Sequence, residues 1–189
     1  MESKTNSLFK STLNYGVYLG IAMIIYSLLL FIFGIMPVGF LKPILLGLLS
    51  LAIYVVGIIF ATKQVRSELY NGEVSYGQAF IIGFLVATFA VIISTIYSYI
   101  QNTFIDSDYF VRIMNAQKDW TQNFMTSKGL SEDQIDKAIE KIDEQIKNYS
   151  PLKTLFKGLI SSIILGAIIS LITSAFLKKK TNPFDNANV

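Results

Sequence analysis

An uncharged stretch of 32 residues, from position 74 to 105, restricts the fold of this chain more than any other segment. As one α-helix it would be about 48 Å long, which exceeds the roughly 30 Å hydrocarbon core of a bilayer. Hydrophobic residues make up 52% of the chain and charged residues 15%, whereas a soluble globular domain has about 25% charged residues. These features predict an integral membrane protein in which this helix tilts, breaks or protrudes at its end.

Three further stretches are long enough to cross a bilayer, which takes about 20 apolar residues. They cover residues 11–36, 43–62 and 158–177. The Pro- and Gly-containing connection between the first two is so short that it allows only an antiparallel helix pair. We therefore predict an all-α integral membrane protein with four transmembrane helices. Its predicted divisions are 1–105 for the first three helices, 106–150 for a polar insertion, 151–180 for the fourth helix and 181–189 for a disordered tail.

The polar insertion has a helical pattern of its own. Ser131 and Gln134 have the spacing of a capping box, and Gly129 lies where a preceding helix is expected to stop. Apolar or large residues recur every three or four positions on both sides of that glycine. The two stripes are Phe110, Ile113, Gln117, Trp120 and Phe124, and Ile135, Ile139, Ile142, Ile146 and Tyr149. The pattern predicts an antiparallel helical hairpin between the third and fourth membrane helices.

The start of the third membrane helix is one candidate polar site. Ser75 and Gln78 have capping-box spacing, and Tyr76 is an aromatic residue suited to headgroup depth. One interpretation is that Gln78 closes the start of the helix or bonds a neighbouring helix. The alternative is that Gln78 recognises a lipid headgroup or a small solute, and we favour the capping role.

The opposite end of the same helix is the most polar intramembrane stretch. In "STIYSYIQNT", Ser94, Ser98 and Gln101 share one helical face. These side chains either bond neighbouring helices as the third helix leaves the membrane, or line a hydrophilic vestibule. The first interpretation is favoured because interhelical polar pairs are ordinary in membrane bundles.

The fourth membrane helix carries a small residue at every fourth position. This stripe is Gly158, Ser162, Gly166, Ser170 and Ser174. Such spacing is typical of helices that pack closely in membranes. Ala79, Gly83 and Ala87 form a matching strip on the third helix, as do Gly16 and Gly20 on the first. A partner within the chain is favoured over a second copy, because the hairpin joins the third and fourth helices.

The chain has few of the residue types that serve in catalysis, metal binding or proton transfer. The chain has no histidine and no cysteine, which removes thiolate catalysis, the commonest metal ligand and the usual acid/base group near neutrality. No charged residue lies in the middle of a span, whereas proton relays and ion pathways normally need one. We predict a protein with no catalytic residue, metal or cofactor, and thus not an enzyme. The basic residues are scattered, so nucleic acid is not a predicted partner.

A family resemblance rests on four segments in order: "GEVSYGQAFIIGFLVA", "STIYSYI", "GLSEDQIDKAIEKI" and "LGAIISLITSAFLKKKTNPF". Together they resemble the small bacterial membrane proteins of the domain-of-unknown-function family numbered 4199, over nearly the whole chain. The resemblance implies a four-helix protein of the bacterial cytoplasmic (inner) membrane, and it implies no activity, ligand or catalytic residue.

Basic residues near the helix ends predict the orientation. Lys4, Lys10, Lys63, Arg66 and the cluster 178–180 all fall on the side of the two termini. Because Lys and Arg beside short connections favour the cytoplasm, both termini are predicted to be cytoplasmic and the hairpin extracytoplasmic.

The leading functional hypothesis is a non-enzymatic interaction, scaffold or envelope-associated role through the hairpin. Its predicted partners are the lipid bilayer and either another protein or a second copy, bound through the hairpin or the fourth helix. The alternative is a transporter of a small uncharged solute or a lipid, built around Gln78 and the polar end of the third helix.

Overall fold

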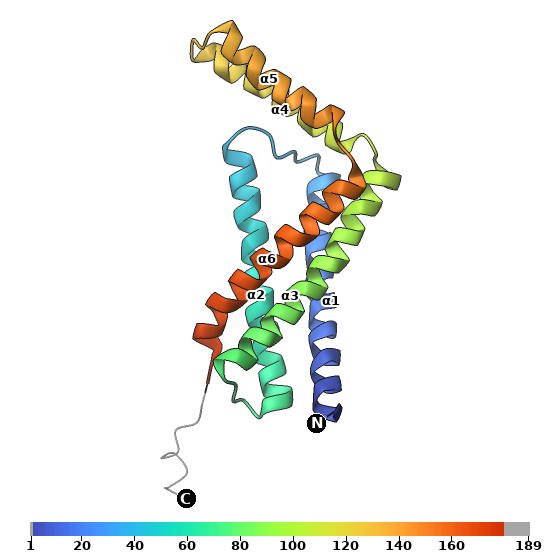
Figure 1. Cartoon of the computed structure of the whole chain (residues 1–189), viewed down its shortest axis with the longest axis vertical. Helices are drawn as coiled ribbons and strands as arrows, with labels where there is room; N and C mark the ends of the chain where they lie inside the picture. Colours follow the sequence, from blue (N-terminus) through green and yellow to red (C-terminus); the bar gives the residue numbers. More distant parts are fainter. Residues whose placement is uncertain (1, 180–189) are drawn as a thin grey trace, which may run out of the picture.

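The computed structural model describes residues 2–179, and within them it is all-helical (Figure 1). Its helices are α1 (Glu2–Ile32), α2 (Leu41–Tyr70), α3 (Tyr76–Ile100), the π-helix η1 (Gln101–Ile105), α4 (Tyr109–Ser127), α5 (Glu132–Lys147) and α6 (Pro151–Leu177). The strand-like pairing in this part of the chain is one isolated bridge between Val74 and Lys179. The all-α prediction is confirmed, while the predicted tail lies outside the described residues.

Four of these helices are long and apolar enough to cross a membrane. Their spans are Thr5–Ile32, Leu41–Tyr70, Tyr76–Ile105 and Pro151–Leu177. Large apolar side chains stand out from the bundle, such as Val56 with 64% and Phe176 with 84% of their surface exposed. Soluble monomers rarely expose contiguous apolar surface on this scale, so a lipid bilayer is the environment that matches these faces.

Two helix ends differ from the stretches predicted from the sequence, and the start of the fourth membrane helix agrees with its prediction. α1 stops at Ile32 instead of continuing to position 36, because Gly34 adopts the left-handed conformation at φ 62°. α2 continues to Tyr70 instead of stopping at position 62. α6 starts at Pro151, as predicted, because proline fits a first helical turn and Ser150 Oγ accepts the N–H of Lys153 at 3.5 Å.

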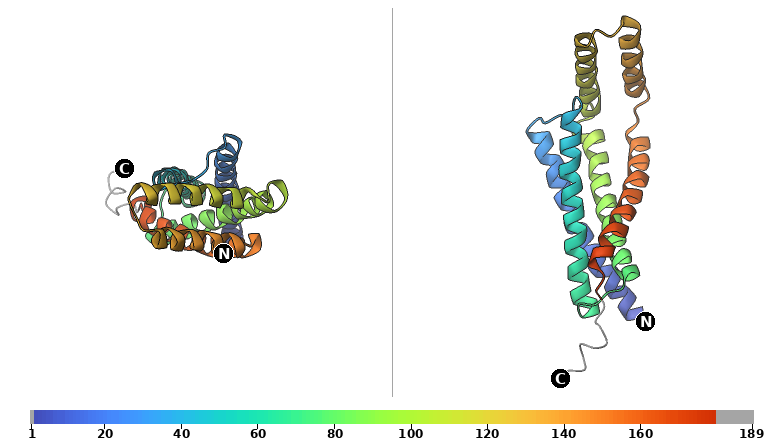
Figure 2. Two further views of the ribbon diagram at one scale, coloured as in Figure 1. Left: turned by 90° about the horizontal axis from the view of Figure 1, so that it is seen from above. Right: turned by 90° about the vertical axis from the view of Figure 1, so that its left-hand side faces the viewer.

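α3 lies at the centre of the bundle and packs against α1, α2 and α6 (Figures 1 and 2). Glycines on α1 allow the backbones to approach. A methyl group at Gly16 would lie 2.5 Å from Phe89 Cβ and 3.1 Å from the Val86 carbonyl oxygen. A methyl group at Gly20 would lie 3.0 Å from Ile93 Cβ. The two glycines predicted on the first helix therefore face α3.

Both ends of the described chain and the α2–α3 turn lie at one end of the bundle (Figure 1). There Val74 and Lys179 exchange two backbone hydrogen bonds of 2.9 Å. Arg66 Nη1 donates to the Leu177 carbonyl oxygen at 3.0 Å. Because the last carbonyls of a helix have no partner within it, these bonds complete the C-terminal end of α6.

The helices α4 and α5 lie side by side beyond the opposite end of the bundle (Figures 1 and 2), and we call them the α4–α5 arm. Lys118 Nζ bonds Asp143 Oδ1 at 2.6 Å between the two helices. The rings of Phe110 and Tyr149 stack with centroids 3.8 Å apart. Neither helix contains a fully buried residue, so each buries only part of its apolar stripe against the other.

The arm is held to the bundle through α4. The Gly39 backbone N–H donates to Gln117 Oε1 at 2.8 Å, and the rings of Phe40 and Trp120 meet edge to face at 4.7 Å. These contacts attach α4 to the α1–α2 connection. The arm is anchored to the bundle at this point, because a partly buried hydrogen bond and an aromatic pair hold α4 there.

An ion pair occupies the turn that leads from η1 into α4. The Arg112 guanidinium bonds both carboxylate oxygens of Asp106, with Nη1 to Oδ1 at 2.8 Å. These hydrogen bonds lower the pKa of the Asp106 carboxyl group below its ordinary value. The pair therefore remains charged at neutral pH and closes the turn.

Candidate functional site

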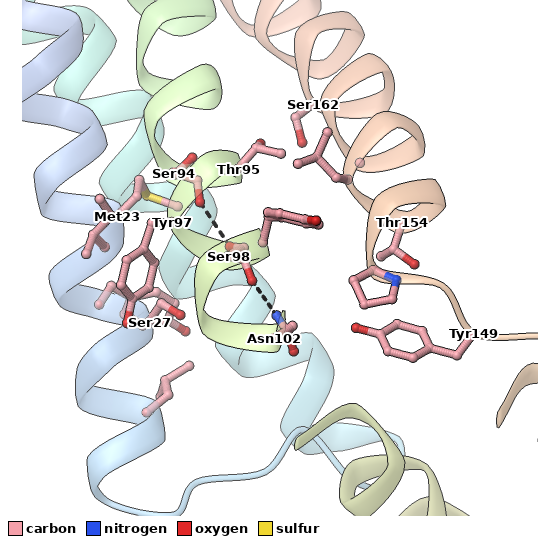
Figure 3. Close-up of a pocket in the computed structure, with 17 residues that line it drawn as sticks. Met23, Ser27, Ser94, Thr95, Tyr97, Ser98, Asn102, Tyr149, Thr154 and Ser162 are labelled. Carbon is pink, nitrogen blue, oxygen red and sulfur yellow. Dashed lines mark hydrogen bonds between the residues drawn. The ribbon is translucent and has the colours of Figure 1, made fainter. Parts of the chain in front are cut away.

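A cavity of about 380 Å³ lies between α1, α3 and α6 at the arm end of the bundle (Figure 3). None of its lining residues, all within the described chain, is acidic or basic. Most of them instead carry a hydroxyl or an amide group. The polar lining residues are Tyr26, Ser27, Ser94, Thr95, Tyr97, Ser98, Tyr99, Asn102, Tyr149, Thr154 and Ser162.

A row of polar side chains one helical turn apart forms the wall that α3 and η1 contribute to the cavity. Ser94 Oγ donates to the Val91 carbonyl oxygen at 3.2 Å, and Ser98 Oγ donates to the Ser94 carbonyl oxygen at 3.0 Å. Asn102 Nδ2 donates to the Ser98 carbonyl oxygen at 2.7 Å (Figure 3). Because the helix backbone takes these hydrogens, the side-chain oxygens are left as acceptors.

Tyr97 brings a donor to the same cavity. Its ring lies on the α1 side, near Met23 and Ser27 (Figure 3). The Tyr97 hydroxyl oxygen is buried and has no hydrogen-bond partner. A buried hydroxyl without a partner costs about 1–3 kcal/mol, so a ligand or an ordered water that accepts from it would stabilise the site.

Divergence of α6 from α3 creates the space. A methyl group at Gly166 would lie 3.0 Å from Ala87 Cβ, whereas one at Gly158, two turns earlier on α6, would meet no atom within 4 Å. Gly158 and Ser162 line the cavity, while Gly166, Ser170 and Ser174 are buried in the bundle. The five-turn packing seam is therefore wrong for its first two members: they face open space, because the helices separate toward the arm.

The C-terminal part of the small-residue stripe on α6 packs against the small-residue strip predicted on the third helix. A methyl group at Gly83 would lie 3.1 Å from Ser170 Oγ, and the contact of Gly166 with Ala87 continues the same antiparallel register. Ser174, like Ala79, is fully buried. These positions pack within one chain, so a second copy cannot use them without separating α6 from α3.

Gln101 does not join Ser94 and Ser98. It is 3% exposed and does not line the cavity; Asn102 is the residue that follows Ser98 there. Gln101 begins the π-helix η1, in which the Asp106 N–H donates to the Gln101 carbonyl oxygen at 2.8 Å. The expectation that the helix would tilt, break or protrude is thus met by a change to the wider π-helical turn.

The residues predicted at the start of the third helix lie at the other end of α3. The Ser75 N–H donates to Gln78 Oε1 at 2.8 Å, and the Gln78 N–H donates to Ser75 Oγ at 3.3 Å. Both bonds of the capping box are therefore present. The Tyr76 hydroxyl donates to the Leu171 carbonyl oxygen at 3.2 Å. The six predicted polar residues do not form one site, because two groups of three occupy opposite ends of one long helix.

A substitution at Gln78 can separate its two predicted roles. Gln78→Glu should leave the melting temperature of the purified protein nearly unchanged, because a carboxylate accepts the same bond and favours a helix N-terminus. Gln78→Leu should destabilise the protein by about 1 kcal/mol through loss of the cap. Equal melting of all three proteins would contradict the capping role.

The sequence from position 14 to position 179 matches a family model described as "Protein of unknown function (DUF4199)". The chain belongs to this family. The match begins within the first span, covers the other three spans and the α4–α5 arm, and confirms the resemblance drawn from the sequence. Comparisons with curated proteins and with solved structures gave no match. Membership in DUF4199 supplies no activity, so the function must be argued from the geometry.

The described part of this DUF4199 protein contains no cluster of side chains suited to a metal ion. Across residues 2–179 no three His, Cys, Asp or Glu side chains are grouped in a way that could hold a metal ion. The charged pairs lie in the arm and its base, such as Lys137 with Asp133 at 2.7 Å. The prediction that the protein is not an enzyme stays a prediction.

Several residues that line the cavity were not among the site residues predicted from the sequence. Ser27, Tyr97 and Tyr149 are far apart in sequence, and only the packing of α1, α3 and α6 brings them together. One signal was present in the sequence: Asn102 continues the four-residue spacing of Ser94 and Ser98.

Proposed function

We propose that this protein is a non-enzymatic interaction or scaffold protein of a bacterial cytoplasmic membrane, and that the α4–α5 arm is its contact surface. The observation that carries the proposal is the fixed projection of the arm beyond the bundle (Figure 1). Gln117 and Trp120 of α4 attach it to the α1–α2 connection. An arm held in this way can present a surface to a partner without loss of much conformational entropy.

The chemistry of α5 indicates the kind of partner. α5 packs against α4, its isoleucines are half-buried, and its exposed charged positions hold more acidic than basic residues. Asp133, Glu140 and Glu144 are exposed on the face turned away from the isoleucine stripe. Such a face is complementary to a basic protein surface and would be repelled by anionic lipid headgroups.

The proposed orientation puts the arm outside the cytoplasm. Its support is the distribution of basic residues, because Lys63, Arg66 and Lys178 belong to the end that holds both chain termini. The arm end of the spans carries Lys42, Lys153 and Lys157, of which only Lys42 lies beside a short connection, residues 33–40. Both termini are thus proposed to be cytoplasmic.

Single cysteines test the orientation and the interaction in one experiment, because the native chain contains none. Thr126, Ser67 and Lys137 are exposed at the arm tip, the opposite bundle end and the α5 outer face. A membrane-impermeant maleimide should label Thr126→Cys in intact cells and should not label Ser67→Cys. Lys137→Cys should be labelled several-fold more slowly in cells than after purification, because a bound partner covers it while every acidic group remains.

Thr126→Cys serves as the control for access, and its labelling rate should be the same in cells and in detergent. Equal rates for Lys137→Cys in the two settings would show that nothing covers α5, and the interaction role would then be wrong. Labelling of Ser67→Cys alone in cells would invert the orientation.

A further inference from the structure

We propose that the cavity between α1, α3 and α6 binds the neutral, hydroxyl-bearing headgroup of a membrane lipid of the diacylglycerol type. This inference goes beyond the interaction role of the arm. It depends on four properties of the cavity: the absence of charge in its lining, its hydrogen-bonding groups, its depth in the bundle and the small residues that leave it open.

The lining excludes an ionic headgroup. A phosphate or a carboxylate that leaves water needs a cation or several donors to offset the loss of hydration. The lining of the cavity contains no Lys or Arg, and the amide hydrogens of Asn102 include one that already bonds the Ser98 carbonyl oxygen. The occupant that fits such a lining is uncharged.

The hydrogen-bonding groups match a hydroxyl. The oxygens of Ser94 and Ser98 can accept, because their hydrogens are donated to α3 carbonyls. The Tyr97 hydroxyl is buried without a partner and can donate. A free alcohol donates one hydrogen and accepts others, so a ligand hydroxyl can donate to a serine oxygen or accept from the Tyr97 hydroxyl.

The position of the cavity favours a lipid over a soluble polyol. Met23 and Leu155, which line it beside the polar groups, are apolar. Every lining residue of α1, α3, η1 and α6 falls within a candidate membrane span, in the half of that span toward the arm. A headgroup bound there lies close to the depth of the bilayer interface, and acyl chains can leave along the apolar residues.

Gly158 keeps the space open. A methyl group at this position would meet no atom within 4 Å, so neither packing nor backbone conformation requires glycine there. A larger side chain at position 158 would occupy the cavity itself. Gly47 on α2 is equally free of neighbours within 4 Å and does not line the cavity, which makes it a matched control.

The experiment uses the purified full-length protein in phosphatidylcholine nanodiscs that contain a trace of diazirine-labelled diacylglycerol. After irradiation, peptides from α3 and α6 around the cavity should carry the label. Gly158→Leu should reduce labelling about tenfold by filling the cavity, and Tyr97→Phe should reduce it about fivefold by removing one donor. Gly47→Leu should be labelled like the native protein.

Melting temperatures measured on the same samples separate binding from folding. If Gly158→Leu lowers the melting temperature, the labelling of Tyr97→Phe becomes the deciding result. This variant removes only the Tyr97 hydroxyl oxygen, which has no hydrogen-bond partner in the protein. The proposal would be overturned if Tyr97→Phe and a folded Gly158→Leu were both labelled as strongly as the native protein.

Competition identifies the ligand class. Unlabelled dioleoylglycerol should suppress labelling, and free glycerol should not. Suppression by glycerol would show that the site takes a soluble polyol, and equal suppression by phosphatidylglycerol would show that the headgroup need not be neutral. Either result contradicts a neutral-lipid site.

Discussion

Gly166→Leu is expected to lower the melting temperature of the detergent-purified protein by several degrees or more. A methyl group at Gly166 would lie 3.0 Å from Ala87 Cβ and 3.0 Å from the Tyr54 hydroxyl. The rest of a leucine side chain must therefore push α6 away from α3. Overpacking of this kind typically costs about 1–3 kcal/mol.

Gly166→Leu is also expected to disturb a buried hydrogen bond. The Tyr54 hydroxyl donates to the Ala87 carbonyl oxygen at 3.0 Å, and Tyr54 is 7% exposed. If leucine displaces that hydroxyl from its acceptor, the unpaired buried groups add about 1–3 kcal/mol of destabilisation. The two effects act at one contact, which is why this variant should be among the most damaging in α6.

Leu171→Ala is the control for this experiment, because Leu171 is 43% exposed on another face of α6. Its loss should cause only a small change in melting temperature. Equal drops for the two variants would mean that α6 packs through a different face. If Gly166→Leu melts normally but loses a cross-linkable dimer, then the seam joins two chains and the packing described above is wrong.

Gly16→Ala is expected to destabilise the protein, whereas Gly47→Ala should stabilise it or leave it unchanged. In an exposed helix interior, alanine is favoured over glycine by about 0.5–1 kcal/mol. Gly47 has no atom within 4 Å of an added methyl group, so this gain can be realised. At Gly16 the methyl group would lie 2.5 Å from Phe89 Cβ.

Phe89 cannot relieve this contact by rotating its ring, because the Cβ atom is fixed to the backbone. α1 must then move away from α3 and lose packing along its length. Thermal unfolding of both variants in the same detergent checks the prediction by the sign of each shift. Shifts of the same sign and size would show that α1 does not approach α3 closely at Gly16.

Local sequence patterns predicted most of the helical architecture. The four spans follow from apolar length, since each uncharged run is long enough for a bilayer. The cap at Ser75 and Gln78 follows from three-residue spacing, and the α6 start follows from Ser150 and Pro151. Such features depend on neighbours within one turn, and therefore a single sequence suffices to find them.

Helix ends at the membrane boundary were harder to predict. α2 continues beyond the apolar run through Lys63 and Arg66, because a helix need not stop where it leaves the bilayer. Arg66 has a role that spacing could not reveal, as it donates to the Leu177 carbonyl oxygen at the far end of the sequence. Only the meeting of α2 and α6 creates that bond.

The small-residue stripe of α6 shows most clearly what residue spacing cannot predict about helix packing. Four-residue spacing indicates that Gly158 and Gly166 share a helical face, and it applies to both equally. The tertiary structure treats them differently: α3 touches Gly166 and has separated from α6 at Gly158. Periodicity describes the surface of one helix, whereas the angle between two helices depends on all the side chains along their contact. Packing at that angle makes the first two of the five predicted seam residues part of a cavity wall, together with Tyr97.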